Sequence, residues 1–345
     1  FGVWMTQPFA GGEDTPAVPE VGPAYPAGLE IGDELVAIGR STDDGSELWL
    51  APRGQAPRVV YRHPDPASVD ALTHDGDLLV ISHSEHGDRR YPALRVLHTA
   101  DTTEEAPAVV AEKWDGEGRG LHASEFAPLS GDTRLLVGHE RRGREELLIW
   151  DVAADTETEI VLDLPGDVTA GWYPDGSALL VGHDHAARSE LYRYDLASGA
   201  LERLDTPTGV VRGATARPDG TVELAWSNAE LPPVIRRADG PVVLTVSDEE
   251  PPAAYPVEDR WVPGPGGDVH ALLVRPAGEG PHATAFLVHG GPEAADDDSY
   301  RARRAAYVDA GYAVVHVNYR GSTGYGSVWR DALTGRPGLT ELDDV

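Results

Sequence analysis

The sequence of 345 residues contains no cysteine and only one lysine, Lys113. The lack of cysteine excludes disulfide bonds and thiolate metal sites, but it leaves the cellular compartment undecided. No apolar run approaches the roughly 20 residues that a helix needs to cross a bilayer, so we expect no membrane-spanning helix. Because lysine is nearly absent, almost all of the positive charge is arginine, as GC-rich coding would produce.

Positive charge is also scarce relative to negative charge. The sequence has 28 basic and 58 acidic side chains, which gives a formal net charge of −30. This balance argues against a surface that follows the phosphates of a nucleic acid. We therefore expect neither nucleic acid nor a membrane as a partner. A salt-adapted organism would also explain the acidity, and the sequence leaves this open.

A repeat dominates the first 250 residues. Three segments each combine an apolar strand, a tight turn and a second apolar strand, and their prolines, Pro128, Pro174 and Pro218, lie 46 and 44 residues apart. A looser fourth copy surrounds Asp75-Gly76. Turns of the Asp-Gly type between apolar runs predict β-hairpins.

A second hairpin is predicted within each repeat, with strands at residues 47–50, 146–151 and 190–195. Four strands at a period in the forties are typical of a β-propeller blade. We count about five full blades between Ile31 and Val246, and an outer remnant of another at Val3 to Gly12. The predicted fold is therefore multidomain and begins with an all-β propeller, with about six blades visible and seven in the complete protein.

His139 and His183 occupy the same position in consecutive repeats. This equivalence favours a structural role in the blades over metal binding. The segment His183-Asp184-His185 offers two histidines in a predicted turn, with no third ligand indicated. We predict no metal site and no cofactor.

An acidic, proline-rich stretch at residues 248–256 resists regular structure and ends the repeats. It predicts a boundary between a propeller over residues 1–250 and a second domain over residues 251–345. The second domain opens with two predicted strands, residues 258–261 and 269–275, joined by a turn rich in glycine and proline.

The next elements alternate between strand and helix. Apolar runs at residues 285–288 and 313–317 predict two fully buried strands. Between them, residues 299–310 predict a short helix that stops at Gly311. Together they predict a right-handed βαβ unit in a parallel sheet. We interpret Asp296-Asp297-Asp298 as favourable charge at the helix N-terminus, with attraction of a cationic amine as a second interpretation.

Both strands lead into glycine-rich loops. His289-Gly290-Gly291-Pro292 follows the first strand, and Asn318-Tyr319-Arg320-Gly321-Ser322-Thr323-Gly324-Tyr325-Gly326 follows the second. Open α/β sheets place active sites at such strand ends. Without Cβ atoms, the N–H groups of adjacent glycines can approach a carbonyl oxygen that becomes negative during acyl transfer. Gly-Gly-Pro after a strand is also common as a plain turn, so the first motif alone does not decide.

The propeller, the proline-rich joint, the two motifs and the acidic residues 341–345 together resemble the prolyl oligopeptidase family of serine peptidases. Its acylaminoacyl-peptidase and dipeptidyl-peptidase-like aminopeptidase branches are the most similar. The resemblance is one of architecture over the propeller and of motif from about His282 to Val345. It implies the N-terminal part of an α/β-hydrolase domain, a Ser-Asp-His triad, short peptides as substrates and a propeller that limits their size.

The resemblance also implies roles for individual residues. The amide of Gly291 would bind the oxyanion, while His289, Gly290 and Arg320 would support the loop. Arg320 would do so by bonding to backbone carbonyls. His289 stands where other branches of the family place an oxyanion tyrosine, and this departure favours a donor from the backbone. Whether His289 only shapes the loop stays open.

No serine of this chain has the flanking glycines of Gly-x-Ser-x-Gly. Phe1 to Met5 already resembles the interior of a strand. We therefore expect a fragment truncated at both ends, before the nucleophile elbow at its C-terminal side. The catalytic serine, aspartate and histidine are expected after Val345, and the fragment alone is expected to be inactive.

Three functions stay open for the complete protein. The first is a serine peptidase acting as an aminopeptidase, acylaminoacyl-peptidase or oligopeptidase. An esterase uses the same triad, and a propeller-based binding protein would carry a degenerate hydrolase remnant. Glu145-Glu146 invites assignment to a substrate's amino terminus, but the repeat favours solvated strand residues. We expect a cytoplasmic protein and leave homo-oligomerisation open.

Overall fold

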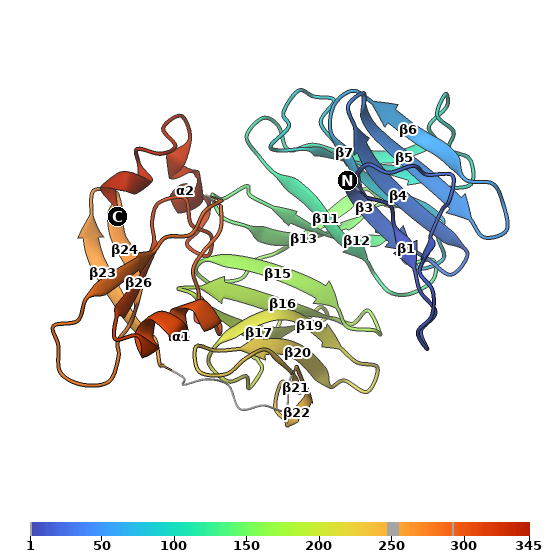
Figure 1. Cartoon of the computed structure of the whole chain (residues 1–345). Helices are drawn as coiled ribbons and strands as arrows, with labels where there is room; N and C mark the ends of the chain where they lie inside the picture. The colour runs from blue at the N-terminus through green and yellow to red at the C-terminus, as the bar shows by residue number, and fades with distance from the viewer. Residues whose placement is uncertain (1, 247–254, 292) are drawn as a thin grey trace. The chain divides into compact units, whose positions relative to one another are not determined.

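A computed structural model of the chain describes residues 2–246, 255–291 and 293–345. Five antiparallel four-stranded sheets follow one another along the chain, and a mixed four-stranded sheet with helices comes after them (Figure 1). The domain boundary predicted between residues 250 and 251 lies outside the described residues, as does the proline-rich joint before Tyr255.

The contacts divide the molecule into two compact units. The first unit comprises Phe1–Arg141 and Leu147–Val161, and the second comprises Arg142–Glu146 and Leu162–Val345. The second unit therefore contains the last two antiparallel sheets together with the mixed sheet.

The five antiparallel sheets confirm the predicted blades, because each is a meander of four strands paired in chain order. In the first three sheets the strands are β3 (Tyr25–Ile31), β4 (Leu35–Thr42), β5 (Gly45–Pro52) and β6 (Arg58–His63); β7 (Ala67–Leu72), β8 (Leu78–His83), β9 (Ala93–His98) and β10 (Val109–Lys113); and β11 (Leu121–Phe126), β12 (Arg134–His139), β13 (Glu146–Asp151) and β14 (Thr156–Ile160). In the last two they are β15 (Asp167–Trp172), β16 (Ala178–His185), β17 (Arg188–Asp195) and β18 (Leu201–Arg203); and β19 (Val210–Ala216), β20 (Val222–Ser227), β21 (Val234–Arg237) and β22 (Val242–Thr245).

The predicted outer remnant is smaller than expected. Within it only β1 (Met5–Thr6) forms a strand, and β1 pairs with β2 (Thr15–Pro16) in a two-stranded sheet. The chain before β1 was predicted as the interior of a strand, but Gly2 makes only an isolated bridge to Ala24. Phe1 lies outside the described residues.

Local sequence explains the hairpins. Gly76 and Gly176 have φ angles of 79° and 66°, a left-handed conformation that glycine adopts without strain. Their N–H groups close the turns by donating to the carbonyl oxygens of Thr73 and Tyr173, at 2.8 and 2.9 Å. The predicted Asp-Gly turns between the first two strands of these blades are therefore present.

Apolar side chains from neighbouring sheets form the cores of the two units. In the first unit, Val80 and Leu94 of the second sheet pack with Leu135 and Trp150 of the third. In the second unit, Tyr173 of the fourth sheet and Trp226 of the fifth belong to one buried cluster. Buried and half-buried residues alternate along β7, as expected for a strand with one face on a core.

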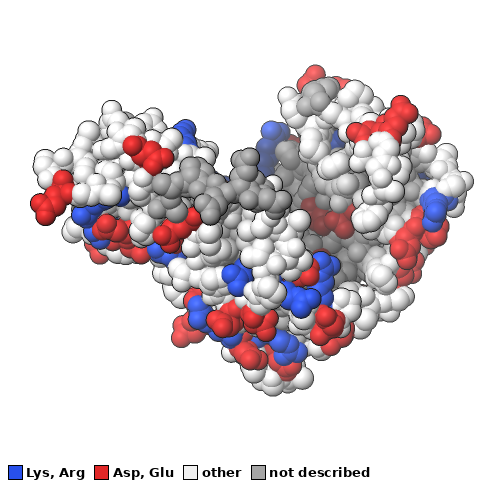
Figure 2. Space-filling model, turned by 60° about the horizontal axis from the view of Figure 1, so that its bottom comes forward, with Lys and Arg blue, Asp and Glu red and all other residues white. Residues whose placement is uncertain are grey.

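Charged side chains of both signs lie next to one another on the face shown in Figure 2. Many of the arginines are bound within the sheets. In the first unit, for example, Arg141 contacts Asp115 at 2.5 Å and Glu157 at 2.7 Å. None of the helices among the described residues is long and apolar enough to cross a membrane.

The mixed sheet has the strand order β23-β24-β26-β25. Its elements are β23 (Glu258–Gly264), β24 (Gly267–Val274), β25 (Thr284–Leu287), α1 (Ala302–Asp309) and β26 (Ala313–Asn318), followed by α2 (Ser327–Arg330) and the short 3-10 helices Asp331–Leu333 and Glu341–Asp343. Strands β25 and β26 are parallel, as the predicted βαβ unit requires. The prediction of a parallel sheet was otherwise wrong, because β24 pairs antiparallel with both β23 and β26.

Two further predictions in this region need correction. Strand β26 is buried as expected, but β25 lies at the edge of the sheet, and Phe286 exposes 56% of its surface. The helix begins three residues later than the predicted Ser299, because Arg301 is still extended with a φ of −134°. Its stop at Gly311 is confirmed by a φ of 89° and by the bond of its N–H to the carbonyl of Val308 at 2.9 Å.

Candidate functional site

Two loops meet at one edge of the mixed sheet. The Gly291 loop, residues 288–298, follows β25, and the Arg320 loop, residues 319–326, follows β26. Since β25 and β26 are parallel, both loops leave the sheet at its carboxyl edge. Pro292 lies outside the described residues. The two predicted motifs are thus brought together, at the place where open α/β sheets carry active sites.

The Asn318 side chain joins the two loops. Its Oδ1 atom accepts the N–H of Asp296 at 2.8 Å, and its Nδ2 atom donates to the carbonyl of Asp296 at 2.9 Å. The N–H of Thr323 also donates to the carbonyl of Ala294, at 3.0 Å. Asn318 is completely buried, so these bonds are shielded from water. The far end of the Gly291 loop is therefore fixed to the end of β26.

The near end of the Gly291 loop is held by His289. Its ring stacks on that of Tyr319, with centroids 4.4 Å apart. The Tyr319 hydroxyl donates to the His289 carbonyl at 2.7 Å, and His289 Nε2 lies 2.9 Å from Ser322 Oγ. A serine beside a histidine suggests a nucleophile and its base. Here Ser322 is completely buried, and the Nδ1 atom of His289 faces Tyr319 and Gly290 rather than a carboxylate.

Gly291 has a conformation that demands glycine. Its φ angle is 134°, and a Cβ atom built there would lie 3.1 Å from the nitrogen of Glu293. Gly290 has open space around it. Both glycines are exposed, and within the described part of the chain the N–H of Gly291 has no hydrogen-bond acceptor. This N–H is thus available to a ligand.

Arg320 braces the second loop, but mainly through a partner that the sequence did not indicate. The guanidinium contacts the Asp344 carboxylate through Nε at 2.9 Å and through Nη2 at 2.9 Å. Among the described residues, one backbone carbonyl accepts from the guanidinium, that of Thr340 at 3.0 Å. The backbone N–H of Arg320 also donates to Asp344, at 2.8 Å. Asp344, in the acidic segment 341–345, is therefore bonded to the Arg320 loop.

The three aspartates before α1 do not act as charges of its first turn, which contains no acidic residue. They are buried and paired instead. Asp296 contacts His316 at 3.1 Å, Asp298 contacts Arg188 at 3.1 Å, and Asp297 is paired with Arg212. Our helix-terminus interpretation was therefore wrong. Attraction of a cationic amine by this run stays a prediction.

Glu146 was interpreted as a solvated strand residue, and this too was wrong. Its side chain is only 4% exposed and is paired with Arg142 at 2.6 Å and Arg144 at 2.9 Å. The buried pairing explains this carboxylate without a ligand.

The histidines at the repeated blade position are buried. His183 lies 3.3 Å from Glu190 through Nδ1, and its Nε2 faces the carbonyl of Pro165. Both ring nitrogens of His183 therefore have partners within the protein. His139 is completely buried at the matching end of β12.

Among the residues that the structure describes, one group of side chains has the composition of a metal site. Ligand atoms of His83, His86 and Glu112 lie within 4.8 Å of one another. However, Arg95 holds Glu112 at 2.7 Å, and the N–H of Glu85 points at His83 Nδ1 from 3.4 Å. If Nδ1 accepts this bond, the proton of the neutral ring sits on Nε2, the atom that would bind the metal. We assign no metal here.

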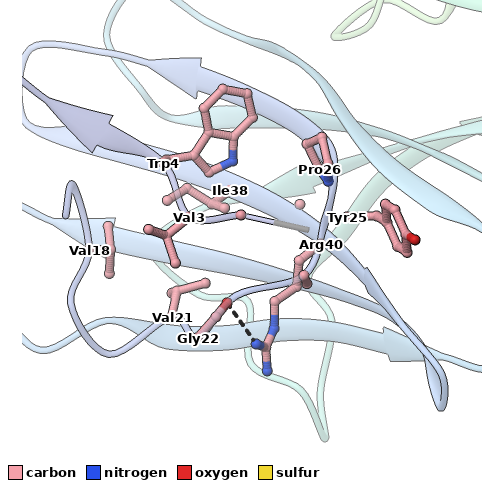
Figure 3. Close-up of a pocket in the computed structure, with 12 residues that line it drawn as sticks. Val3, Trp4, Val18, Val21, Gly22, Tyr25, Pro26, Ile38 and Arg40 are labelled. Atoms are coloured by element: carbon pink, nitrogen blue, oxygen red, sulfur yellow. Dashed lines mark hydrogen bonds between the residues drawn. The ribbon is translucent and has the colours of Figure 1, made fainter.

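An apolar cavity of about 150 Å³ lies in the first unit, beside β4 (Figure 3). Trp4, Val18 and Ile38 line it, and its one charged side chain, Arg40, is bonded to the carbonyl of Gly22 at 3.2 Å and to Glu47. Its lining contains no serine, histidine or carboxylate, and we assign it no catalytic role. The two loops of the mixed sheet, which carry the predicted motifs, are the candidate site.

Comparison with known proteins covers both parts of the chain. Residues 298–345 match the model of the prolyl oligopeptidase family. Over 94 residues the chain is 37% identical to a probable dipeptidyl-peptidase 5 of Emericella nidulans and 35% identical to dipeptidyl-peptidase 5 of Trichophyton equinum. These alignments cover 26% of this chain and 13% of each relative.

Solved structures extend the likeness to the blades. A puromycin hydrolase superposes with a TM-score of 0.75 at 20% identity, over 97% of this chain and 57% of its own. A structure from a study of two prolyl endopeptidases gives 0.74 at 17% identity, over 92% and 50%. A puromycin-hydrolyzing peptidase of Mycobacterium tuberculosis gives 0.63 at 18% identity, over 96% and 65%. At these identities the likeness shows the shared fold, a propeller followed by part of a hydrolase domain.

Proposed function

Because the chain belongs to the prolyl oligopeptidase family of serine peptidases, we propose that the complete protein is a serine peptidase that hydrolyses short peptides. The observation that carries the proposal is the available N–H of Gly291, which belongs to a loop at the carboxyl edge of the sheet that is bonded to the neighbouring loop. Acyl transfer needs such a donor, because the carbonyl oxygen of the substrate becomes an oxyanion.

In the proposed mechanism a serine outside residues 1–345 attacks the peptide carbonyl while a histidine accepts its proton. The Gly291 N–H and the N–H after the nucleophile donate to the oxyanion. The histidine then protonates the leaving amine, and water releases the acyl group in a second cycle of the same steps. His289, Gly290 and Arg320 support the loops and take no part in proton transfer.

The polypeptide of residues 1–345 by itself is expected to be inactive. It contains no Gly-x-Ser-x-Gly, and Ser322, whose hydroxyl lies 2.9 Å from His289 Nε2, is completely buried. Turnover of an aminoacyl-nitroanilide by this polypeptide, persisting through purification, would contradict the assignment of the triad to residues outside it.

The propeller is proposed to limit substrate size. If its blades enclose the approach to the active site, short peptides enter and folded proteins do not. The complete enzyme can be tested with one peptide sequence in three forms: free, fixed in a surface loop of a stable protein, and displayed at a flexible terminus of that protein. We expect kcat/KM to be far lower for the loop than for the free peptide. Similar values would contradict the filter.

A second pair of substrates separates a peptidase from an esterase. An ester and an amide of the same acyl group should both be hydrolysed, since one triad and one oxyanion hole serve both. Hydrolysis of the ester alone would favour the esterase. Hydrolysis of neither would favour a binding protein.

A further inference from the structure

A chain of hydrogen bonds leads from the Gly291 loop into the last blades of the second unit. It starts at Asn318, whose amide orientation is fixed by Asp296. Because the Asp296 N–H must donate and its carbonyl must accept, Oδ1 of Asn318 faces the former and Nδ2 the latter. The second proton of Nδ2 then points to the Tyr325 hydroxyl, 2.8 Å away.

This arrangement determines the next two bonds. An amide NH2 group can only donate, so the Tyr325 oxygen accepts from Asn318. The single proton of the hydroxyl is therefore directed to His270 Nδ1, at 2.6 Å. His270 must then carry its own proton on Nε2, which lies 3.0 Å from Asp259 Oδ1. One tautomer of a neutral histidine satisfies every partner.

Blade strand β17 closes the chain. Arg188, its first residue, contacts Asp259 at 2.8 Å and Asp298 of the Gly291 loop at 3.1 Å. The Gly291 loop is thus bonded both directly to the blade and indirectly through His270 and Tyr325.

The surroundings keep His270 in the state that the chain requires. The ring is 1% exposed and stacks on Trp261, with centroids 4.4 Å apart. Burial lowers the pKa of His270 below its ordinary value, although Asp259 acts in the opposite direction. Burial therefore favours the neutral ring, in which Nδ1 accepts from Tyr325.

We propose that Tyr325 and His270 are positioning residues, which hold the Gly291 loop in its donor conformation through Asn318. The proposal rests on the proposed function, because only in a peptidase would the Gly291 N–H serve as an oxyanion donor. Tyr325 acts by accepting the second Nδ2 proton of Asn318. His270 acts by accepting the hydroxyl proton of Tyr325 at Nδ1.

The first test compares Tyr325→Phe with Tyr255→Phe in the complete protein. Tyr255 is the control, since its hydroxyl donates to the carboxylate of Asp309 at 2.6 Å and not to a residue of the Gly291 loop. Hydrogen exchange of the amides of residues 293–298 should be about tenfold faster in Tyr325→Phe and unchanged in Tyr255→Phe, as the loss of one hydrogen bond predicts. Equal exchange in the two variants would overturn the proposal.

A second pair of variants keeps the test independent of the phenylalanine substitution. His270→Asn retains an acceptor near the position of Nδ1, whereas His270→Leu does not, and both lose the bond to Asp259. We expect His270→Asn to protect the loop amides better than His270→Leu. Equal protection would show that His270 contributes only by packing, and would overturn its positioning role.

Activity gives a separate readout. Tyr325→Phe should lower kcat by about ten- to a hundredfold with little change in KM, because a displaced donor affects the transition state more than substrate binding. If the wild-type enzyme has no turnover, the proposed function fails while the exchange measurements still decide the positioning role. A normal kcat in Tyr325→Phe would overturn the catalytic part of the proposal.

Discussion

The Nε2 atom of His289 lies 2.9 Å from the Oγ atom of Ser322, a hydroxyl that is completely buried. Replacing His289 by phenylalanine would keep a ring that stacks on Tyr319 but would leave this hydroxyl without its partner. An unsatisfied buried hydroxyl costs about 1–3 kcal/mol. We therefore expect His289→Phe to lower stability by about that amount in urea unfolding and to reduce the acylation rate only slightly.

A double variant checks this explanation. In Ser322→Ala the hydroxyl is gone, so adding His289→Phe should cost much less stability than it does alone. Additive costs would contradict the pairing. A loss of acylation in His289→Phe as large as that from removing the Gly291 amide hydrogen would favour the histidine side chain as the oxyanion donor.

Gly291 should contribute through its backbone. Proline is unsuitable for removing the amide hydrogen, because Gly291 has a φ of 134° and proline is confined near −65°. Replacing the Gly291 amide by an ester with glycolic acid removes the hydrogen and preserves the conformation. We expect acylation to slow by about 100- to 1,000-fold, the scale of one oxyanion donor. The same replacement at Gly290 is the control, and an equal effect at both positions would contradict a specific role for Gly291.

The Arg320–Asp344 pair should stabilise the second loop. Arg320→Lys removes the two-nitrogen contact with a carboxylate whose side chain is fully buried. We expect a loss of about 1–3 kcal/mol in the free energy of unfolding. Arg275→Lys is the control, because Arg275 and its partner Glu258 are 50% and 40% exposed and such pairs contribute about 1 kcal/mol or less. Equal effects would contradict the bracing role.

Stability should also depend on Glu30 of β3. Burial, followed by the charges of Asp70 and Glu125, raises the pKa of Glu30 from 4.5 to about 7. The folded state then holds the proton more tightly than the unfolded chain, so this contribution to stability is complete below pH 4.5 and is lost as the pH rises through about 7. Glu30→Gln should flatten the stability profile over this range. Glu34→Gln, on the exposed turn after β3, should not, and an unchanged profile in Glu30→Gln would contradict the assignment.

The features that could be predicted are those that depend on residues close together in the sequence. The Asp-Gly turns and the period of the prolines were sufficient for the blades, and the strand ends before Gly290 and Tyr319 located the two loops. Pairings between distant residues were not predictable. Arg188 and Asp298 are separated by 110 positions, and Arg212 and Asp297 by 85, so no local pattern joins them. The apolar run of β25 predicted a fully buried strand, but Phe286 exposes 56% of its surface, because an apolar run does not reveal which strands flank it.

The central claim is that the complete protein carries a catalytic serine served by the Gly291 loop. Its most direct test is reaction of the complete protein with a phosphonylating reagent directed at activated serines, followed by mass spectrometry. We predict stoichiometric modification of one serine outside residues 1–345 and a parallel loss of peptide hydrolysis. The Gly291 ester variant should react much more slowly at that serine. Absence of modification in a folded wild-type protein, or modification of a serine within residues 1–345, would contradict the account.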